Sequence, residues 1–176
     1  MLSRRDAMSV DERREASARI AATVAPMLTT HDDGVVALYA PTSTEVATAA
    51  LDTEARAHGL RVAYPRVVAG SRVLELAEST IDALVPGAYG LREPVGPALP
   101  LADIAVFVVP GIAFDREGGR VGWGHGYYDA TLAAARAGVL RIGLAFDCQL
   151  VERIPRDAHD IGLDLVVTET TSYGRR

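Results

Sequence analysis

Three glycines that alternate with other residues form the pattern best suited to chemistry in this sequence: Gly122, Gly124 and Gly126. They follow an expected buried strand and come directly before an expected helix that begins near Gly126. Because glycine has no Cβ atom, the backbone N–H groups around it approach an anion closely. The N-terminus of the helix adds the positive end of its dipole. The pattern therefore predicts a phosphate-binding loop.

Two charged residues stand in register with these glycines. Arg120 offers a fixed positive charge with the fork geometry that suits phosphate. Asp129 falls in the first turn of the expected helix, where it would hold a magnesium ion against the same phosphates. The alternative is a turn that serves only the path of the chain, and the glycine spacing alone favours it. We favour the phosphate site because the strand, the arginine, the helix start and the carboxylate all occur at suitable positions around the glycines.

The composition excludes several kinds of site and partner. The chain has 176 residues, a net charge of −5 and 49% hydrophobic residues, which predicts one domain over residues 1–176 with a substantial core. A negative net charge argues against a nucleic-acid partner. All 18 basic residues are arginine, so there is no Walker A loop, Schiff-base lysine or lysine general base. Tyr127, where a third glycine belongs, argues against a dinucleotide-binding fingerprint.

Other features of the sequence indicate a cytoplasmic location. Cys148 has no second cysteine to pair with, which suits a reducing compartment. The longest apolar run, residues 104–109, is far too short to span a bilayer. The charged N-terminus lacks the apolar core of a signal peptide. We expect a monomer with no membrane partner.

Helices and strands are expected to alternate along the chain. Ser9 and Glu12 form a capping box that opens the first helix, and Thr42 and Glu45 repeat its spacing ahead of the second. Pro65 is expected to end one strand. The first expected helix ends near residue 28, the second runs from about 42 to 58, and the third from about 126 to 137. The expected strands are 35–40, 60–64, 72–77, 104–109, 140–146 and 163–168. A turn is expected at 31–34 and an irregular loop at 86–100.

This alternation predicts an α/β fold, with a single-domain, mostly parallel twisted sheet and helices on both faces. In such sheets, ligands bind beyond the carboxyl ends of the strands. Two segments, 41–45 and 110–129, are expected at such ends. The fold would therefore bring Glu45 and the glycine-rich segment to the same edge.

The segment from Pro110 to Leu132 resembles the signature of the 5-formyltetrahydrofolate cyclo-ligase family, also called 5,10-methenyltetrahydrofolate synthetase. The likeness lies in Pro110-Gly-Ile-Ala-Phe-Asp and in Gly119-Arg-Val-Gly-Trp-Gly-His-Gly-Tyr-Tyr-Asp-Ala-Thr-Leu. Segments 39–48 and 145–149, Pro155, His159-Asp160 and segment 164–169 are also similar to the family. The resemblance covers most of the chain, from about residue 8 to residue 169.

The resemblance implies an enzyme that binds 5-formyltetrahydrofolate and ATP with Mg²⁺. In the implied reaction, the formyl oxygen attacks the γ-phosphate and N10 then closes the ring. The products are 5,10-methenyltetrahydrofolate, ADP and phosphate. The implied roles are ATP binding by Arg120, Gly122, Trp123, Gly124, His125, Gly126, Tyr127 and Tyr128; folate binding by Glu45, Tyr127 and Tyr128; magnesium binding by Asp129 and Asp160; and catalysis by Arg120, Tyr128 and Asp129.

Several of these residues also have a purely structural interpretation. Glu45 completes a capping box with Thr42, and only the resemblance favours its folate role. One of Tyr127 and Tyr128 is expected in the core and the other against a ligand ring. His125 is more typical of a solvent-facing loop residue than of a general base. Asp160 is ordinarily part of a solvated turn, and Arg156 is expected to be surface charge.

The resemblance leaves one alternative function open. Family members use a basic N-terminal helix to supply a lysine and an arginine to ATP, and this sequence begins within that helix. Arg4 or Arg5 could substitute in part. A non-catalytic folate- or nucleotide-binding relative is therefore the alternative to the enzyme.

Overall fold

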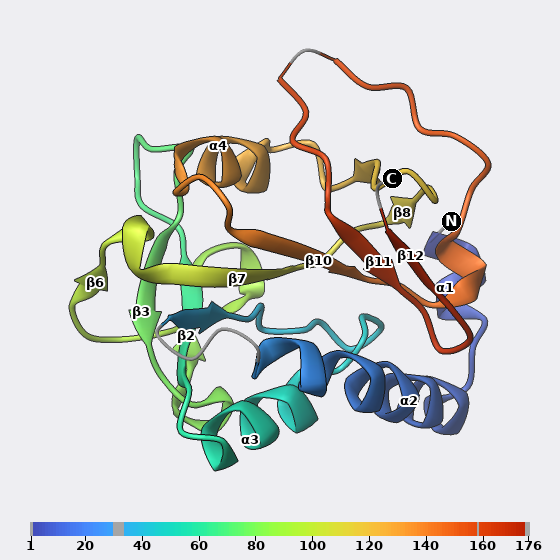
Figure 1. Ribbon diagram of the computed structural model, residues 1–176, viewed down its shortest axis with the longest axis horizontal. Helices are drawn as coiled ribbons and strands as arrows, with labels where there is room; N and C mark the ends of the chain where they lie inside the picture. The colour runs from blue at the N-terminus through green and yellow to red at the C-terminus, as the bar shows by residue number, and fades with distance from the viewer. Residues whose placement is uncertain (1, 30–33, 158, 175–176) are drawn as a thin grey trace.

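The computed structural model describes residues 2–29, 34–157 and 159–174, which form one eight-stranded sheet with helices on both sides (Figure 1). The strand order is β12-β11-β10-β7-β1-β2-β3-β6. The central strands β11, β10, β7, β1 and β2 are parallel, whereas β3, β6 and β12 are antiparallel to their neighbours. The sheet strands are β1 (Val35–Ala37), β2 (Arg61–Arg66), β3 (Glu75–Glu78), β6 (Ala98–Leu99), β7 (Ile104–Val109), β10 (Leu140–Leu144), β11 (Leu165–Val167) and β12 (Ser172–Gly174).

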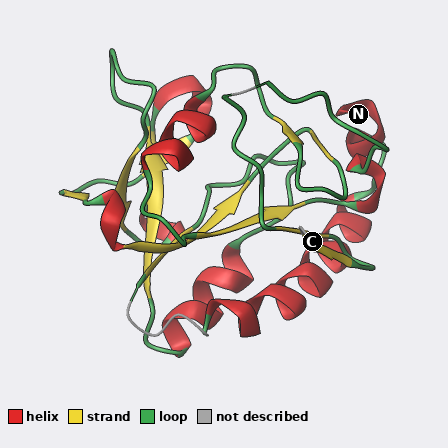
Figure 2. Cartoon of the chain, turned by 45° about the horizontal axis from the view of Figure 1, so that its top comes forward, coloured by secondary structure: helices red, strands yellow, loops and turns green. Residues whose placement is uncertain are grey.

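The helices cover the two faces of the sheet. Figure 1 shows α2 (Val10–Leu28) and α3 (Ala49–Ala57) on one face and α4 (Tyr127–Ala134) on the other, and Figure 2 shows the same layers from a second side. All six residues of β7 are buried. Val106 and Val108 pack with the α2 and α3 side, while Phe107 and Val109 pack with α4. The predicted fold class is therefore confirmed.

The first helix begins where its sequence predicts. The Ser9 hydroxyl accepts from the Glu12 N–H at 3.2 Å, and the Glu12 carboxylate accepts from the Ser9 N–H at 2.6 Å. These bonds satisfy two of the N–H groups that a helix start leaves without partners. The short helix α1 (Leu2–Asp6) precedes it and contacts the 3₁₀ turn η4 (Asp147–Gln149).

The predicted cap of the second helix is wrong. Thr42 and Glu45 belong to a separate turn, in which the Glu45 N–H donates to the Thr42 carbonyl at 3.2 Å. The helix α3 begins later, at Ala49, after the N-cap residue Thr48. The Thr48 hydroxyl does not cap the helix, because it donates to the Tyr39 carbonyl at 2.9 Å. Thr42 and Glu45 instead close a turn in the segment between β1 and α3.

Pro65 does not end its strand, which is a second correction. β2 continues to Arg66, and Pro65 lies opposite Leu76 of β3. Proline lacks an N–H donor and is tolerated where no neighbouring strand needs it. β1 pairs with β2 only as far as Ala63, so no β1 residue lies opposite Pro65. Sequence alone does not reveal how short the neighbouring strand is.

Other boundaries also shift. β3 starts at Glu75 rather than residue 72, α4 ends at Ala134 rather than 137, and the strand expected to reach residue 146 ends at Leu144. The segment 86–100 is not wholly irregular. It contains η2 (Ala88–Gly90), β5 (Arg92–Glu93) and β6, and β5 pairs with β4 (Val85–Pro86). Most of the predicted turn at 31–34 lies outside the described residues.

Within the described part of the chain, no helix is both long and apolar enough to cross a membrane. This agrees with the absence of a long apolar run in the sequence.

Candidate active site

A cavity of about 710 Å³ opens beyond the carboxyl ends of the central strands, and every residue that the sequence predicted for the site lines it. Glu45 comes from the turn after β1, and the 118–129 segment, called here the glycine loop, comes after β7. Asp160 comes from the segment after η4. The lining set is Tyr39, Ala40, Thr42, Glu45, Pro65, Arg66, Val67, Leu74, Tyr89, Leu91, Arg92, Glu93, Pro110, Arg120, Val121, Gly122, Trp123, Gly124, His125, Gly126, Tyr127, Tyr128, Asp129, Ile154, Pro155 and Asp160.

A small hairpin positions the start of the glycine loop. Its strands are β8 (Ala113–Phe114) and β9 (Arg120–Val121), and buried Asp115 closes the turn between them. The Asp115 carboxylate accepts from the N–H groups of Glu117 at 3.0 Å and Gly119 at 2.6 Å. A Cβ on Gly119 would lie 2.4 Å from that carboxylate, so this turn requires glycine. The turn thus sends the chain back towards the cavity at Arg120.

Asp115 also ties the hairpin to the 154–160 segment. Its carboxylate accepts from the Ile154 N–H at 2.9 Å and from Arg156 Nη2 at 3.0 Å. Burial alone raises the pKa of Asp115, but the bonds from Ile154, Gly119 and Arg156 outweigh it and hold the pKa below its ordinary value. Arg156 is therefore not simply surface charge, which corrects the sequence interpretation. One carboxylate organises two parts of the cavity wall.

Arg120 lies almost buried at the base of the cavity. Its side chain is 6% exposed, and its Nη2 donates to Asp129 Oδ2 at 2.9 Å. The guanidinium lies 5.7 Å from the centre of the Tyr128 ring. Its Nε is buried and has no hydrogen-bond partner among the described residues. A Cβ on Gly122 would lie 2.7 Å from Arg120 Nη1, so the glycine leaves room for this cation.

The glycine loop presents unpaired backbone donors next to that cation. The N–H groups of residues 122–126 donate to no acceptor among the described residues. Gly124 and Gly126 have positive φ angles of 83° and 70°, a conformation that side-chain-bearing residues rarely adopt. Gly126 is the N-cap of α4, and it makes no side-chain cap. The loop, the helix start and Arg120 together form an arrangement suited to an anion.

The two tyrosines that open α4 differ in environment, although both line the cavity. Tyr128 packs against Arg120, and burial, followed by the nearby Glu45 carboxylate, raises its pKa well above the ordinary value, with Arg120 opposing in part. Its hydroxyl therefore stays protonated at neutral pH. Tyr127 lies at the mouth, where its hydroxyl is 3.2 Å from that of Tyr89. His125 stacks on Tyr89 with ring centres 5.2 Å apart.

Glu45 lines the cavity from the turn that follows β1. One of its carboxylate oxygens accepts from the Thr42 N–H at 2.8 Å. The residue is half-buried, and its charge raises the pKa values of Tyr39 and Tyr128, for which burial is the larger cause. Glu45 therefore closes its turn and also presents negative charge to the cavity.

The carboxylates expected to hold magnesium lie on the same wall, but they already have partners. Asp129 accepts from Arg120 and, at 3.3 Å, from the Ile161 N–H. Asp160 accepts from the Asp157 N–H at 2.7 Å. No cluster of three or more histidine, cysteine or acidic residues forms a metal site in the described chain. Mg²⁺ is commonly held by one or two carboxylates together with substrate phosphates, and these two aspartates fit that mode rather than a protein-only site.

Comparisons with known proteins identify the family of the chain. A family model described as the 5-formyltetrahydrofolate cyclo-ligase family matches residues 1–169. The chain belongs to this family. The 5-formyltetrahydrofolate cyclo-ligase of Escherichia coli strain K12 is 32% identical over 94% of both chains, and that of Mycolicibacterium smegmatis is 36% identical over 76% of this chain and 72% of the relative.

Solved structures support the same family. The NMR structure of Aquifex aeolicus 5,10-methenyltetrahydrofolate synthetase is 34% identical, with a TM-score of 0.83 over 99% of this chain and 89% of that one. A Mycoplasma pneumoniae 5,10-methenyltetrahydrofolate synthetase, at 23% identity and a TM-score of 0.78, shares the fold over 96% of this chain and 93% of that one.

Several residues that shape the site of this cyclo-ligase family member were not predicted as site residues. Buried Gln149 donates to the carbonyls of Gly111 at 2.9 Å and Ile112 at 3.2 Å, and so fixes the chain after β7. Tyr89 brings an aromatic ring from a segment expected to be irregular. Their roles come from contacts distant in sequence, which local spacing does not show. Arg4 and Arg5 do not belong to the cavity lining that the structure describes.

Proposed function

We propose that the chain converts 5-formyltetrahydrofolate to 5,10-methenyltetrahydrofolate with consumption of ATP, in the presence of Mg²⁺, and releases ADP and phosphate. We further propose that it does so as a single domain over residues 1–176, as a cytoplasmic monomer. Family membership supports the overall activity. The observation that carries the proposal is the shared cavity, which gathers the predicted folate and phosphate residues from three separate segments.

The proposed chemistry needs a better leaving group than an amide oxygen. The formyl oxygen attacks the γ-phosphorus while the bond to ADP breaks, giving an N5 iminium phosphate. N10 then attacks the activated carbon and loses its proton, and the carbon–oxygen bond breaks to release phosphate. Phosphoryl transfer depends on positioning and charge neutralisation more than on covalent help from the protein. A site without an activated nucleophile is therefore consistent with this reaction.

The residues of the glycine loop supply that positioning. The unpaired N–H groups of residues 122–126, which line the cavity, would donate to the phosphates, and Arg120 would neutralise the developing charge. Asp129 holds the Arg120 guanidinium in place, so the cation needs little reorganisation when the nucleotide binds. Tyr128 is protonated, and its ring lies 5.7 Å from the Arg120 guanidinium. These residues require no acid–base change during the transfer.

Asp129 and Asp160 would hold Mg²⁺ together with the phosphates, and the ion would add positive charge next to the transferring group. Glu45 would orient the pterin by accepting hydrogen bonds from its N–H donors. Its place in the lining of the same cavity as the glycine loop supports binding of the two substrates next to each other.

An absorbance assay for the methenyl product tests the proposal directly. We expect product only when 5-formyltetrahydrofolate, ATP and Mg²⁺ are all present, with one ADP formed per product. Omission of each component in turn is the control. Folded protein that binds folate or ATP but forms no product at saturating substrates would instead support the non-catalytic binding relative.

A further inference from the structure

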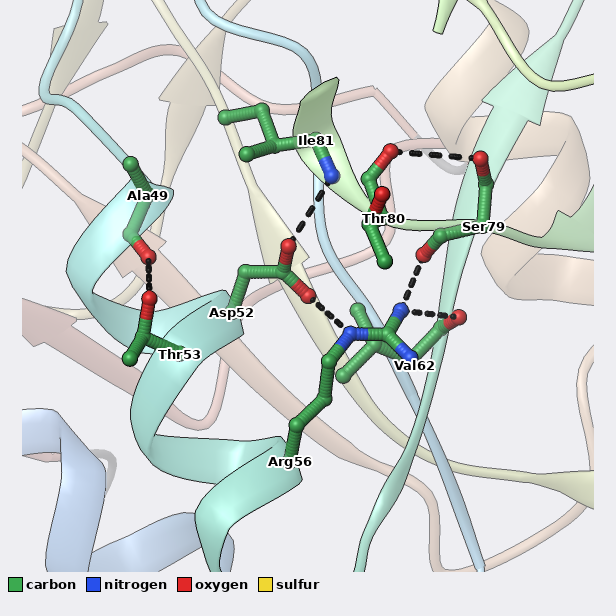
Figure 3. A network of polar contacts seen from close by, with 8 residues as sticks. All are labelled: Ala49, Asp52, Thr53, Arg56, Val62, Ser79, Thr80 and Ile81. Atoms are coloured by element: carbon green, nitrogen blue, oxygen red, sulfur yellow. Dashed lines mark hydrogen bonds and ion pairs between the residues drawn. The ribbon is translucent and has the colours of Figure 1, made fainter. Parts of the chain in front are cut away.

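A polar clamp lies on the α3 side of the sheet, outside the residues that line the cavity (Figure 3). Asp52 of α3 is 4% exposed, and its two carboxylate oxygens have different partners. Oδ1 accepts from Arg56 Nε at 2.7 Å, and Oδ2 accepts from the Ile81 N–H at 2.9 Å. An aspartate is rarely buried unless it is paired and hydrogen-bonded, and both conditions hold here.

Arg56 extends the clamp to two further segments. Its Nη2 donates to the Val62 carbonyl at 3.3 Å and also to the Ser79 carbonyl. Val62 belongs to β2, whereas Ser79 directly follows β3. The Asp52–Arg56 pair therefore joins α3 to the chain that leaves β3, as the dashed lines in Figure 3 show.

That chain leads directly into one wall of the cavity. Ile81 opens η1 (Ile81–Ala83), which is followed by the paired strands β4 and β5, called here the 85–93 hairpin. The clamp holds the Ile81 N–H from one side, and Arg92 of the hairpin donates to the Ile81 carbonyl from the other. Glu93 is fixed as well, because its Oε1 accepts from the Val67 N–H at 3.1 Å. The position of the hairpin base therefore depends on the Ile81 backbone, whose N–H is hydrogen-bonded to Asp52.

The tip of the hairpin contacts the glycine loop through Tyr89, which also lines the cavity. Tyr89 has a φ of 55° and is the non-glycine residue with positive φ among the described residues. This backbone is costly for a bulky side chain and persists only when its surroundings hold it. The ring stacks on His125, and the hydroxyl lies 3.2 Å from that of Tyr127. A small shift at the base of the hairpin would change this spacing.

We propose that Asp52, acting through Arg56 and the Ile81 backbone, is a positioning residue that sets the width of the folate side of the cavity. It touches no substrate. Its carboxylate fixes the 85–93 hairpin, and the hairpin places Tyr89 opposite Tyr127. This inference rests on the proposed function in one respect, namely that the folate occupies this side of the cavity.

The variant Asp52→Asn tests the inference. Arg56 and Ile81 donate to different carboxylate oxygens, and an amide replaces one of these oxygens by an NH₂ group, which would face a donor. We expect the KM for 5-formyltetrahydrofolate to rise about ten-fold, as the loss of one charge-assisted bond suggests. The kcat and the KM for ATP should change by less than about three-fold.

The neighbouring variant Thr53→Ala is the matched control. Its exposed hydroxyl donates only within its own helix, to the Ala49 carbonyl at 3.1 Å, so it should leave both KM values unchanged. Arg56→Lys serves as a second test variant if Asp52→Asn does not fold. It keeps a cation next to Asp52 but lacks the fork that reaches Val62 and Ser79, and it should raise the same KM.

A direct binding measurement keeps this test separate from the test of the reaction. Trp123 is the single tryptophan of the chain, is 57% exposed and lines the cavity, so its fluorescence should report bound 5-formyltetrahydrofolate. Weaker folate binding in Asp52→Asn supports the inference. If the wild-type protein binds folate but forms no methenyl product, the proposed function is wrong and the inference about Asp52 still stands. A lower melting temperature with unchanged folate affinity and KM would overturn it and leave Asp52 as a purely structural residue.

Discussion

The two walls of the cavity are built in different ways. The turn that starts the glycine loop has contacts close in sequence, because Asp115 binds the N–H groups of residues two and four positions later, although Asp115 also binds the distant Ile154 and Arg156. A second wall, the 85–93 hairpin, is held at its base through Ile81, whose N–H donates to Asp52, 29 positions earlier in the chain. A wall of the first kind leaves a readable local pattern in the sequence. A wall of the second kind becomes visible only when the chain is folded.

The walls also differ in what they offer a ligand. The glycine loop presents unpaired N–H groups and a nearly buried arginine, which suit phosphate. The hairpin presents Tyr89 and Leu91, an aromatic and an apolar side chain suited to a flat organic ring. If this division is correct, changes in the glycine loop should mainly affect phosphoryl transfer, and changes near Glu45 or the hairpin should mainly affect folate binding.

Asp129→Asn should have the largest effect and should fall on turnover. Asparagine keeps the shape of Asp129 but removes the charge that pairs with Arg120 and would hold Mg²⁺. Loss of metal-assisted charge stabilisation typically costs several kcal/mol, so kcat should fall about a thousand-fold while the fold remains intact. Turnover measured against Mg²⁺ concentration, with a thermal melt, checks this.

The exposed carboxylate of Glu117, at the tip of the β8–β9 turn, provides the control for Asp129. Glu117→Gln should retain normal turnover. Near-normal turnover in Asp129→Asn, with unchanged Mg²⁺ dependence, would remove Asp129 from the metal site and would weaken the phosphate assignment of the glycine loop.

Glu45→Gln should have the next largest effect and should fall on folate rather than on ATP. Charge-assisted hydrogen bonds are worth about 1.5–3 kcal/mol each, which corresponds to a loss of folate affinity of about ten-fold to one-hundred-fold. Titration of both substrates measures the difference, with exposed Glu54→Gln of α3 as the control. If Glu45 only stabilises its turn through the bond from the Thr42 N–H, the variant should instead have a lower melting temperature and unchanged folate affinity, which would contradict the folate role.

Asp115→Asn should have the smallest effect on turnover and should appear mainly in stability and its pH dependence. The folded-state pKa of Asp115 is lowered from an ordinary value of 3.8. Its contribution to stability is therefore complete above that value and is lost as the pH falls through the folded pKa. We expect the variant to be less stable than the wild type by about 1.5–3 kcal/mol at neutral pH.

The stability difference between Asp115→Asn and the wild type should shrink as the solution is acidified. Melting temperatures measured from neutral pH to about pH 3 check this. Exposed Asp103→Asn is the control and should follow the wild type throughout. A stability difference that stays constant over this range would show that the charge of Asp115 does not hold the turn.

The residues of the glycine loop could be selected from the sequence because their pattern is local. Glycines at positive φ, an arginine and a first-turn carboxylate are all visible as spacing, and all line the cavity. The buried strand β7 and the capping box of α2 were predictable for the same reason. Periodic burial and helix capping depend on neighbours a few residues apart.

The sequence failed where a distant contact overrides a local preference. Thr42 and Glu45 have capping-box spacing, yet the helix begins only at Ala49. The Thr48 hydroxyl donates to the Tyr39 carbonyl and does not cap the helix. Pro65 is tolerated because β1 is short. Asp52 and Arg56 have the i,i+4 spacing of a helical ion pair, but nothing local shows that they bind Ile81 and Ser79. These features depend on which segments become neighbours, and one sequence does not contain that information in readable form.

A structure of the protein with 5-formyltetrahydrofolate and a non-hydrolysable ATP analogue tests the central claim most directly, namely that one cavity holds both substrates for phosphoryl transfer. We predict that the triphosphate lies along residues 122–126 next to Arg120, and that the pterin lies near Glu45. The formyl oxygen should approach the γ-phosphorus within about 3–3.5 Å, the separation of a near-attack arrangement. Either ligand bound outside this cavity, or a γ-phosphate directed away from the formyl group, would contradict the account.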